Sequence, residues 1–199
     1  YTASAIVQPV SEIFDRSFPS HRLINIVDDG LIQDIIAGGG VTVATARRLL
    51  HCCMAAVDSG ADVILNTCSS VGEVVAHAQS FVPIPIVRID RPMVEAAVES
   101  GSSIAVLATL PTTLGPTVGL VKDVAREVGK EIGIVEGLAD GAFQALISGD
   151  PTTHDNAIIQ AARNAANDAD VIVLAQGSMA RMRDALADAT GIQVYASPD

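Results

Sequence analysis

The chain repeats one short segment, and this repeat limits the possible folds more than any other feature of the sequence. Residues 61–71 read ADVILNTCSSV and residues 169–179 read ADVIVLAQGSM, so the two copies align without a gap at an offset of 108 positions. In each copy an apolar run ends in small polar residues, which is typical of a strand covered on both faces that leads into a helix. The repeat therefore predicts two related α/β halves.

Strand and helix signals alternate along the rest of the chain, in the same order in both halves. Strands are expected at residues 23–27, 63–65, 84–89, 104–108, 132–135 and 192–195, and in the run before Gln176. Helices are expected at residues 6–14, 31–37, 41–59, 71–80, 90–99, 142–147, 153–167 and 179–187, with one more ending at residue 128. The predicted fold class is α/β, with two pseudo-symmetric, Rossmann-like parallel-sheet halves at residues 1–91 and 92–199.

One strand of this pattern has no counterpart in the first half. Residues 1–6 correspond to residues 109–114, so the partner of the 104–108 strand would precede Tyr1. We therefore expect a native N-terminus that is longer by a handful of residues, which the intact mass of the native protein would test. A duplicated α/β protein is expected to bind its ligand in the cleft between its halves, where the turns that follow the strands would face each other.

Composition and charge exclude several classes of function. The 199 residues are 49% hydrophobic with a formal net charge of −11, which argues against nucleic acid or an anionic membrane surface as a partner. No apolar run is long enough to span a membrane, and no signal-peptide pattern is present. Three cysteines and four scattered histidines form neither a disulfide framework nor a metal-ligand pattern, so we expect no metal and a reducing, cytoplasmic location.

Four turns that follow expected strands carry the candidate site. Cys68 stands where a strand ends and a helix begins, a position that favours the thiolate. Small polar residues and free helix-start amides can cradle a carboxylate, and no Lys or Arg lies within these turns. The substrate-binding candidates are Thr2, Ser4, Asn66, Thr67, Ser69, Ser70, Thr109, Thr112, Thr113, Gly177 and Ser178.

The Asn-Thr-Cys turn, paired with the turn at residues 174–180, resembles the aspartate/glutamate/hydantoin racemase superfamily over essentially the whole chain. The resemblance implies two similar Rossmann-like domains and cofactor-independent chemistry at a carbon next to a carboxylate or carbonyl. It also implies a small carboxylate as substrate and a possible homo-oligomer. Racemases of this family use two facing cysteines, one to remove the proton and one to return it.

This sequence departs from the family pattern at the second cysteine, where it has Gln176. A neutral amide cannot act as a general acid or base, so Gln176 is expected to hydrogen-bond the substrate. Three hypotheses follow. The first is a racemase or isomerase in which Cys68 is the acid/base, and water, Ser178 or another group replaces the second thiol. The second is a one-thiol decarboxylase or lyase of a malonate-like substrate, and the third is a non-catalytic protein that binds small carboxylates.

Simpler interpretations exist for several of these residues. Free cysteine is often a small buried hydrophobic residue, which is an alternative for Cys68 and the preferred interpretation for Cys52 and Cys53. Asp28 follows an expected strand and is interpreted as a turn residue rather than a substrate ligand. Glu73 stands in the first turn of a helix, where acidic residues are favoured, and is interpreted as a cap.

Overall fold

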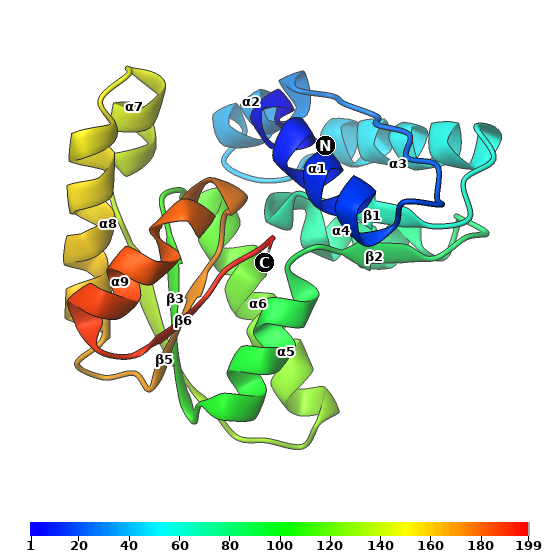
Figure 1. Ribbon diagram of the computed structural model, residues 1–199. Helices are drawn as coiled ribbons and strands as arrows, with labels where there is room; N and C mark the ends of the chain where they lie inside the picture. Colours follow the sequence, from blue (N-terminus) through cyan, green and yellow to red (C-terminus); the bar gives the residue numbers. More distant parts are fainter. Residues whose placement is uncertain (199) are drawn as a thin grey trace. The chain divides into compact units, whose positions relative to one another are not determined.

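The computed structural model describes residues 1–198, apart from the side chain of Ala5, and has an α/β fold that divides into two compact units (Figure 1). Unit 1 is Tyr1–Ile89 and unit 2 is Asp90–Asp199. The elements of unit 1 are η1 (Ser4–Ile6), α1 (Val7–Ser17), α2 (Gly30–Ala37), α3 (Val43–Asp58), β1 (Ile64–Asn66), η2 (Ser69–Val71), α4 (Gly72–Ala78) and β2 (Ile86–Arg88). The elements of unit 2 are α5 (Arg91–Ser100), β3 (Ser103–Ala108), α6 (Pro111–Glu127), β4 (Gly133–Leu138), α7 (Ala142–Ile147), α8 (Pro151–Ala165), β5 (Val171–Leu174), η3 (Gly177–Met182), α9 (Arg183–Thr190) and β6 (Gln193–Tyr195).

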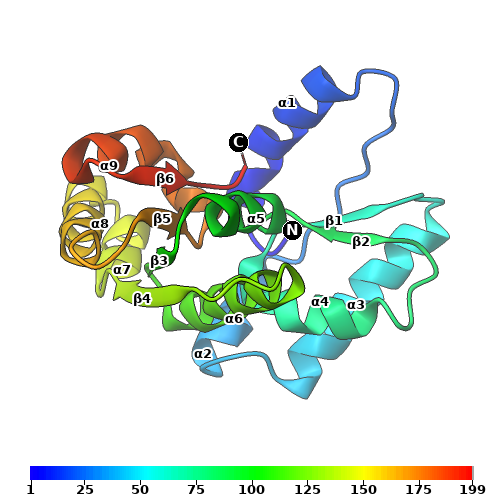
Figure 2. The same ribbon diagram turned by 90° about the horizontal axis from the view of Figure 1, so that it is seen from below.

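Unit 2 is a three-layer arrangement around a four-stranded parallel sheet of order β4-β3-β5-β6. Alternate residues of β3 point to opposite faces. Ile104 and Val106 belong to a core cluster that includes residues of α5 and α6, whereas Ala105 and Leu107 belong to a cluster that includes residues of α8 and α9. Figures 1 and 2 show these two helix pairs on opposite sides of the sheet. A strand between two helical layers must be apolar on both faces, as the sequence of β5 predicts.

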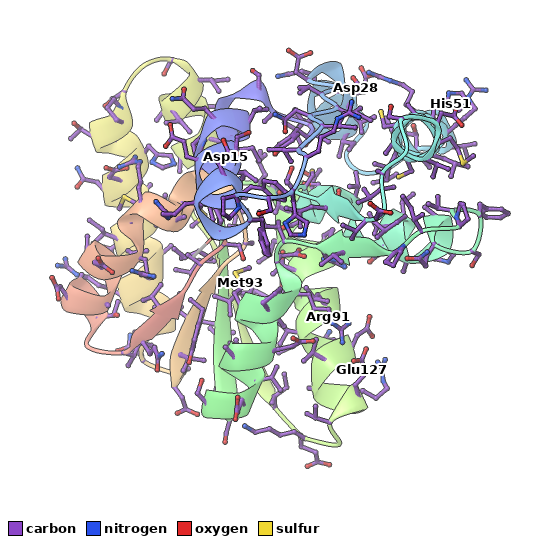
Figure 3. All side chains as sticks on the ribbon, turned by 45° about the vertical axis from the view of Figure 1, so that its right-hand side comes forward. Asp15, Asp28, His51, Arg91, Met93 and Glu127 are labelled. Atoms are coloured by element: carbon purple, nitrogen blue, oxygen red, sulfur yellow. The ribbon has the colours of Figure 1, made fainter. Side chains whose placement is uncertain are left out.

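A short network of ion pairs joins the first two helices of unit 2. Arg91 at the start of α5 donates to Glu95 one turn later, at 2.8 Å, and also to Glu127 at the end of α6. The side chains of Arg91 and Glu127 can be followed in Figure 3. These exposed pairs contribute little stability individually, and the packing of the two helices rests mainly on their buried apolar residues.

Unit 1 has a smaller parallel sheet, in which β1 pairs with β2. Ile64 and Ile86 pack against a cluster of buried residues from α2, α3 and α4. Leu65 and Val87, on the opposite face, are 44% and 45% exposed. The prediction of a strand covered on both faces is therefore correct for β5 and wrong for β1, because helices of this unit pack on only one face of its sheet.

Residues 23–27, predicted as a strand, form no β-ladder. Two backbone hydrogen bonds connect the end of this segment to Tyr1: the Tyr1 nitrogen donates to Ile26 O and the Asp28 N–H donates to Tyr1 O, both at 2.9 Å. In unit 2 the corresponding strand, β4, pairs with β3 along its length. The described part of unit 1 contains no counterpart of β3 with which this segment could form a ladder.

Helix ends follow local side-chain chemistry. Thr42 caps α3 by accepting a hydrogen bond from the Thr45 N–H at 3.2 Å, and the Thr45 hydroxyl accepts one from the Thr42 N–H at 2.8 Å. Gly60 follows the end of this helix with φ +77°, a conformation that glycine adopts without strain. The helix predicted at residues 179–187 is instead two elements, η3 and α9. Within residues 1–198, no helix is both long and apolar enough to cross a membrane.

Candidate active site

Cys68 lies at the carboxyl end of β1 and directly precedes η2. The Asn66 side chain stabilises this turn, because its Nδ2 donates to Cys68 O at 3.0 Å. The Cys68 side chain is only 8% exposed and belongs to the same apolar cluster as Val71 and Val75. The structure thus places the thiol where the sequence predicts it along the chain, but in an apolar setting rather than an open polar turn.

Two hydroxyl groups of the predicted site are buried without a hydrogen-bond partner among the described residues. They are Thr67 Oγ1, next to Cys68 in unit 1, and Thr112 Oγ1, in the first turn of α6 in unit 2. Buried polar atoms in folded proteins nearly always have a partner, so these two hydroxyls stand out among the candidate residues. Of the neighbouring candidate residues, Ser70 and Thr113 are also buried, and Ser69 is half-buried.

The start of the chain lies beside the segment that precedes α2. The Asp28 N–H donates to Tyr1 O at 2.9 Å. Thr2 is buried and Ser4 is exposed. Both line an open hollow of about 430 Å³, together with Ala3, Asp29, Gly30, Ile32 and Gln33.

The neighbouring carboxylate, Asp28, serves the structure of unit 1. Arg48 of α3 donates to both of its oxygens, from Nε at 3.0 Å and from Nη2 at 2.5 Å, and also contacts Asp34 of α2. Figure 3 labels Asp28 beside this helix pair. With both oxygens bound to a guanidinium, Asp28 fixes α3 to the loop before α2, in agreement with its interpretation as a turn residue.

The sequence predicts that Cys52 and Cys53 are both buried core residues. The structure confirms this prediction for Cys53 only. Cys53 is buried in the core cluster of unit 1, and Cys52 is half-buried. Burial raises the pKa of both thiols. Both groups are therefore poor candidates for an acid/base that works near neutral pH.

In unit 2 the structure brings Thr109 and Gln176 together from the ends of adjacent strands. Gln176 Oε1 accepts a hydrogen bond from the Thr109 N–H at 2.6 Å and another from Thr109 Oγ1 at 3.1 Å. A backbone N–H can only donate, so the side-chain oxygen of Gln176 must face Thr109. Its Nε2 group is then the end that faces away, as a donor. Gly177 and Ser178 follow at the exposed start of η3.

A cation that the sequence analysis missed lies at the cysteine turn. A Cβ built on Gly72 would come within 2.3 Å of Arg88 Cζ, so the Arg88 guanidinium lies directly against the start of α4, four residues after Cys68. Arg88 ends β2, outside the four turns, and is opposite Asn66 in the parallel register. The signal that could have found it is the combination of a glycine at the helix start and an arginine at the end of the next strand.

The chemistry available to these residues is that of a thiol, hydroxyls, amides and one guanidinium. Among the described residues, no group of three or more His, Cys, Asp or Glu side chains could hold a metal ion. A thiol can exchange a proton with a carbon acid, while hydroxyls and amides can bind carboxylate or carbonyl oxygens.

Fold and site together define a duplicated α/β protein with polar turns at the carboxyl ends of its parallel strands, one of which carries a buried cysteine. The chain belongs to the Asp/Glu/Hydantoin racemase family, whose model matches residues 2–199. A comparison with curated proteins found no match.

Solved structures show the same fold. Glutamate racemase from Aquifex pyrophilus has 16% identity and a TM-score of 0.67, with 98% of this chain and 76% of that chain covered. Glutamate racemase from Bacillus anthracis has 14% identity and a TM-score of 0.59, with coverages of 78% and 61%. Allantoin racemase from Pseudomonas fluorescens has 21% identity and a TM-score of 0.52, with coverages of 76% and 65%. The chain thus spans less than two thirds of the last two proteins.

Proposed function

We propose that the protein is a racemase-type enzyme that acts, without a cofactor, at the carbon next to a carboxylate or carbonyl of a small acid, and that Cys68 is its acid/base. The observation that carries this proposal is the pairing of Cys68 with Thr67 at the end of β1. A thiol and a buried hydroxyl without a partner are adjacent there, one able to move a proton and the other able to bind an oxygen of the substrate.

Family membership supports the reaction class. Two of the solved neighbours are named as glutamate racemases and one as an allantoin racemase, so an amino acid and a cyclic ureide are the two models for the substrate. Both carry an acidic C–H next to a carbonyl carbon. Removal of this proton produces an enolate-like anion, which the hydroxyl and amide donors of the strand-end turns would stabilise.

A second candidate, a one-thiol decarboxylase, is favoured by the geometry of Gln176. The Thr109 N–H fixes the Gln176 oxygen at 2.6 Å, so the position equivalent to Cys68 in the repeat presents an amide donor and no proton acceptor. Loss of carbon dioxide from a malonate-like acid generates the carbanion without a base. A single thiol then completes the reaction by protonating one face of the carbanion.

Exchange in deuterated water separates these functions. A racemase incorporates deuterium at the α-carbon of recovered glutamate, aspartate or allantoin, whereas a decarboxylase releases carbon dioxide from a substituted malonate and labels only the product. Cys68→Ala is expected to remove either activity while the protein stays folded. Full activity of this variant would refute the role of Cys68, and absence of both reactions in the unmodified protein would favour the non-catalytic binding protein.

A further inference from the structure

The outer edge of β4 is an open strand edge of unit 2. β4 stands at one end of the sheet order, so within residues 1–198 only its edge toward β3 is paired (Figure 2). The Gly133 N–H donates to Ser102 O at 2.8 Å, on the β3 side. Backbone groups of alternate residues point to opposite edges of a strand, so the N–H and C=O groups of Ile134 and Glu136 point away from β3. A strand edge of this kind is a template for pairing with another strand.

An open hollow of about 600 Å³ lies along one face of β4. Ile132 and Ile134 form part of its lining and pack against the core cluster that includes residues of α6. The two lysines of the chain, Lys122 and Lys130, both lie here, although the net charge of the chain is −11. The complete lining is Lys122, Ala125, Arg126, Lys130, Ile132, Ile134 and Glu136. The hollow thus combines an apolar surface, three cations and one carboxylate.

The sequence of this edge is complementary to itself. Residues 130–136 read KEIGIVE, so Lys130 and Glu136 stand three positions on either side of Gly133, and Ile132 and Ile134 stand one position on either side. In an antiparallel pairing of two copies centred on Gly133, Ile132 is opposite Ile134 and Lys130 is opposite Glu136. A pairing shifted by two residues in either direction places Glu136 opposite an apolar residue instead. Opposite charges and apolar pairs across strands are stabilising, so one register is favoured.

Both charged residues can take part in such a pairing. Lys130 Nζ donates to Val98 O at 2.5 Å and to Glu99 O at 3.1 Å, which connects it to the end of α5. Both acceptors are neutral carbonyl groups, and an ammonium group has three donors, so one donor remains for a carboxylate. The exposed Glu136 side chain makes no hydrogen bond or ion pair within residues 1–198.

The first half of the repeat contains the same pattern in a different setting. Residues 22–28 read RLINIVD, with Arg22 and Asp28 in place of Lys130 and Glu136. This segment forms no ladder, and Arg48 binds both oxygens of Asp28. In unit 2, by contrast, the pattern lies on the open edge of a sheet and its carboxylate is unpaired within the described residues.

We propose that β4 pairs with β4 of a second copy of this chain, antiparallel and centred on Gly133, so that the two sheets become continuous. Ile134 exchanges both backbone hydrogen bonds with Ile132 of the second copy, and Lys130 forms an ion pair with Glu136 of the second copy. The two-fold symmetry of this arrangement makes each contact occur twice. The surface contains none of the candidate active-site residues, so this inference is independent of the proposed function.

Sedimentation equilibrium of the full chain tests the ion pairs. The unmodified protein is expected to form dimers. Glu136→Lys should raise the dissociation constant of the dimer about 10-fold, because two attractive pairs become repulsive. Asp188→Lys is the matched control, because it changes the net charge equally on the exposed surface of α9, which packs beside β6 at the other end of the sheet. A monomer at every concentration would overturn the proposal, and the cationic hollow would then be open to an acidic partner. Equal dissociation constants for Glu136→Lys and the unmodified protein would also overturn it.

A disulfide between the two copies tests the register. In the proposed pairing Gly133 is opposite Gly133 of the second copy, with Cα atoms about 4.5 Å apart, so Gly133→Cys should form a disulfide-linked dimer. A Cβ at Gly133 approaches the Ser103 side chain most closely, at 3.2 Å from Oγ, and this side chain can shift. Glu131→Cys is the matched control, because its two copies would be four residues apart along the strands, about 13 Å.

Non-reducing electrophoresis after mild oxidation measures this cross-link. The account predicts a dimer band for Gly133→Cys that dithiothreitol removes, and no more dimer for Glu131→Cys than for the unmodified protein. No cross-link in Gly133→Cys, or equal cross-linking in both variants, would show that any dimer uses another surface or register, and would overturn the proposal.

Discussion

Gln176→Cys would restore the second thiol of the family pattern, and its consequences follow from the two hydrogen bonds at Thr109. The substitution removes the acceptor of the Thr109 N–H at 2.6 Å and of its hydroxyl at 3.1 Å. Thr109 is 3% exposed, so water cannot readily replace the lost acceptor. A buried donor without a partner costs about 1–3 kcal/mol, and we expect the free energy of unfolding to fall by this amount.

The same variant is expected to gain activity while it loses stability. A positioned acid/base group contributes typically about 10²–10⁴-fold to a proton transfer, so racemisation in Gln176→Cys should rise by about 10²-fold or more. Urea unfolding measures the first effect, and polarimetry together with α-deuterium exchange measures the second. Gln176→Glu is the control for stability, because its carboxylate keeps an acceptor for Thr109. Gln176→Ser is the control for activity, because serine is close to cysteine in size but supplies no thiol. Unchanged stability in Gln176→Cys would refute the described anchoring, and unchanged racemisation would refute the idea that the missing thiol prevents two-base chemistry.

Three further predictions concern the stability of unit 2. Gly137→Ala would place a Cβ 2.3 Å from Leu107 Cδ2 in the packed sheet and should destabilise the protein by about 1–3 kcal/mol. Gly115 has open space on the surface of α6, so Gly115→Ala should stabilise the protein by about 0.5–1 kcal/mol. Urea unfolding measures both changes. Hydrogen bonds from Arg181 lower the pKa of Asp155, so this pair stabilises the folded state at neutral pH and loses its contribution as the pH falls through that lowered pKa. The stability of Asp155→Asn should therefore decrease less on acidification than that of the unmodified protein, and equal decreases would contradict this assignment.

The gapless repeat was sufficient to predict most of the fold, because it fixed the order of strands and helices in both halves. Residues 171–174 are buried on both faces, as their unbroken apolar run predicts. The same run at residues 63–65 and the segment at residues 23–27 behave differently, because the coverage and pairing of a strand depend on neighbours that are distant in the sequence. Local pattern predicts the extended backbone, and tertiary context decides whether a ladder and a second covered face exist.

The sequence predicts the residues of the candidate site only where it also predicts the ends of the strands. Thr109 and Gln176 meet because parallel strands that are neighbours in the sheet end at the same edge. The missing partner of the Thr67 hydroxyl is a property of the packed structure, and the position of Arg88 against Gly72 is indicated in the sequence only by a glycine at a helix start and an arginine at the end of the next strand. Arg88 comes 20 positions after Cys68, at the end of another strand, and a search of the turns alone does not find it.

The most direct test of the account is α-deuterium exchange by the unmodified protein and by Cys68→Ser, with glutamate, aspartate, allantoin and substituted malonates as substrates. The serine variant is close to the native residue in size but lacks the thiol, and circular dichroism confirms that it is folded. The account predicts that at least one substrate is labelled or decarboxylated by the unmodified protein, and that Cys68→Ser lowers this rate by about 10²-fold or more. A folded Cys68→Ser variant that retains the full rate would contradict it.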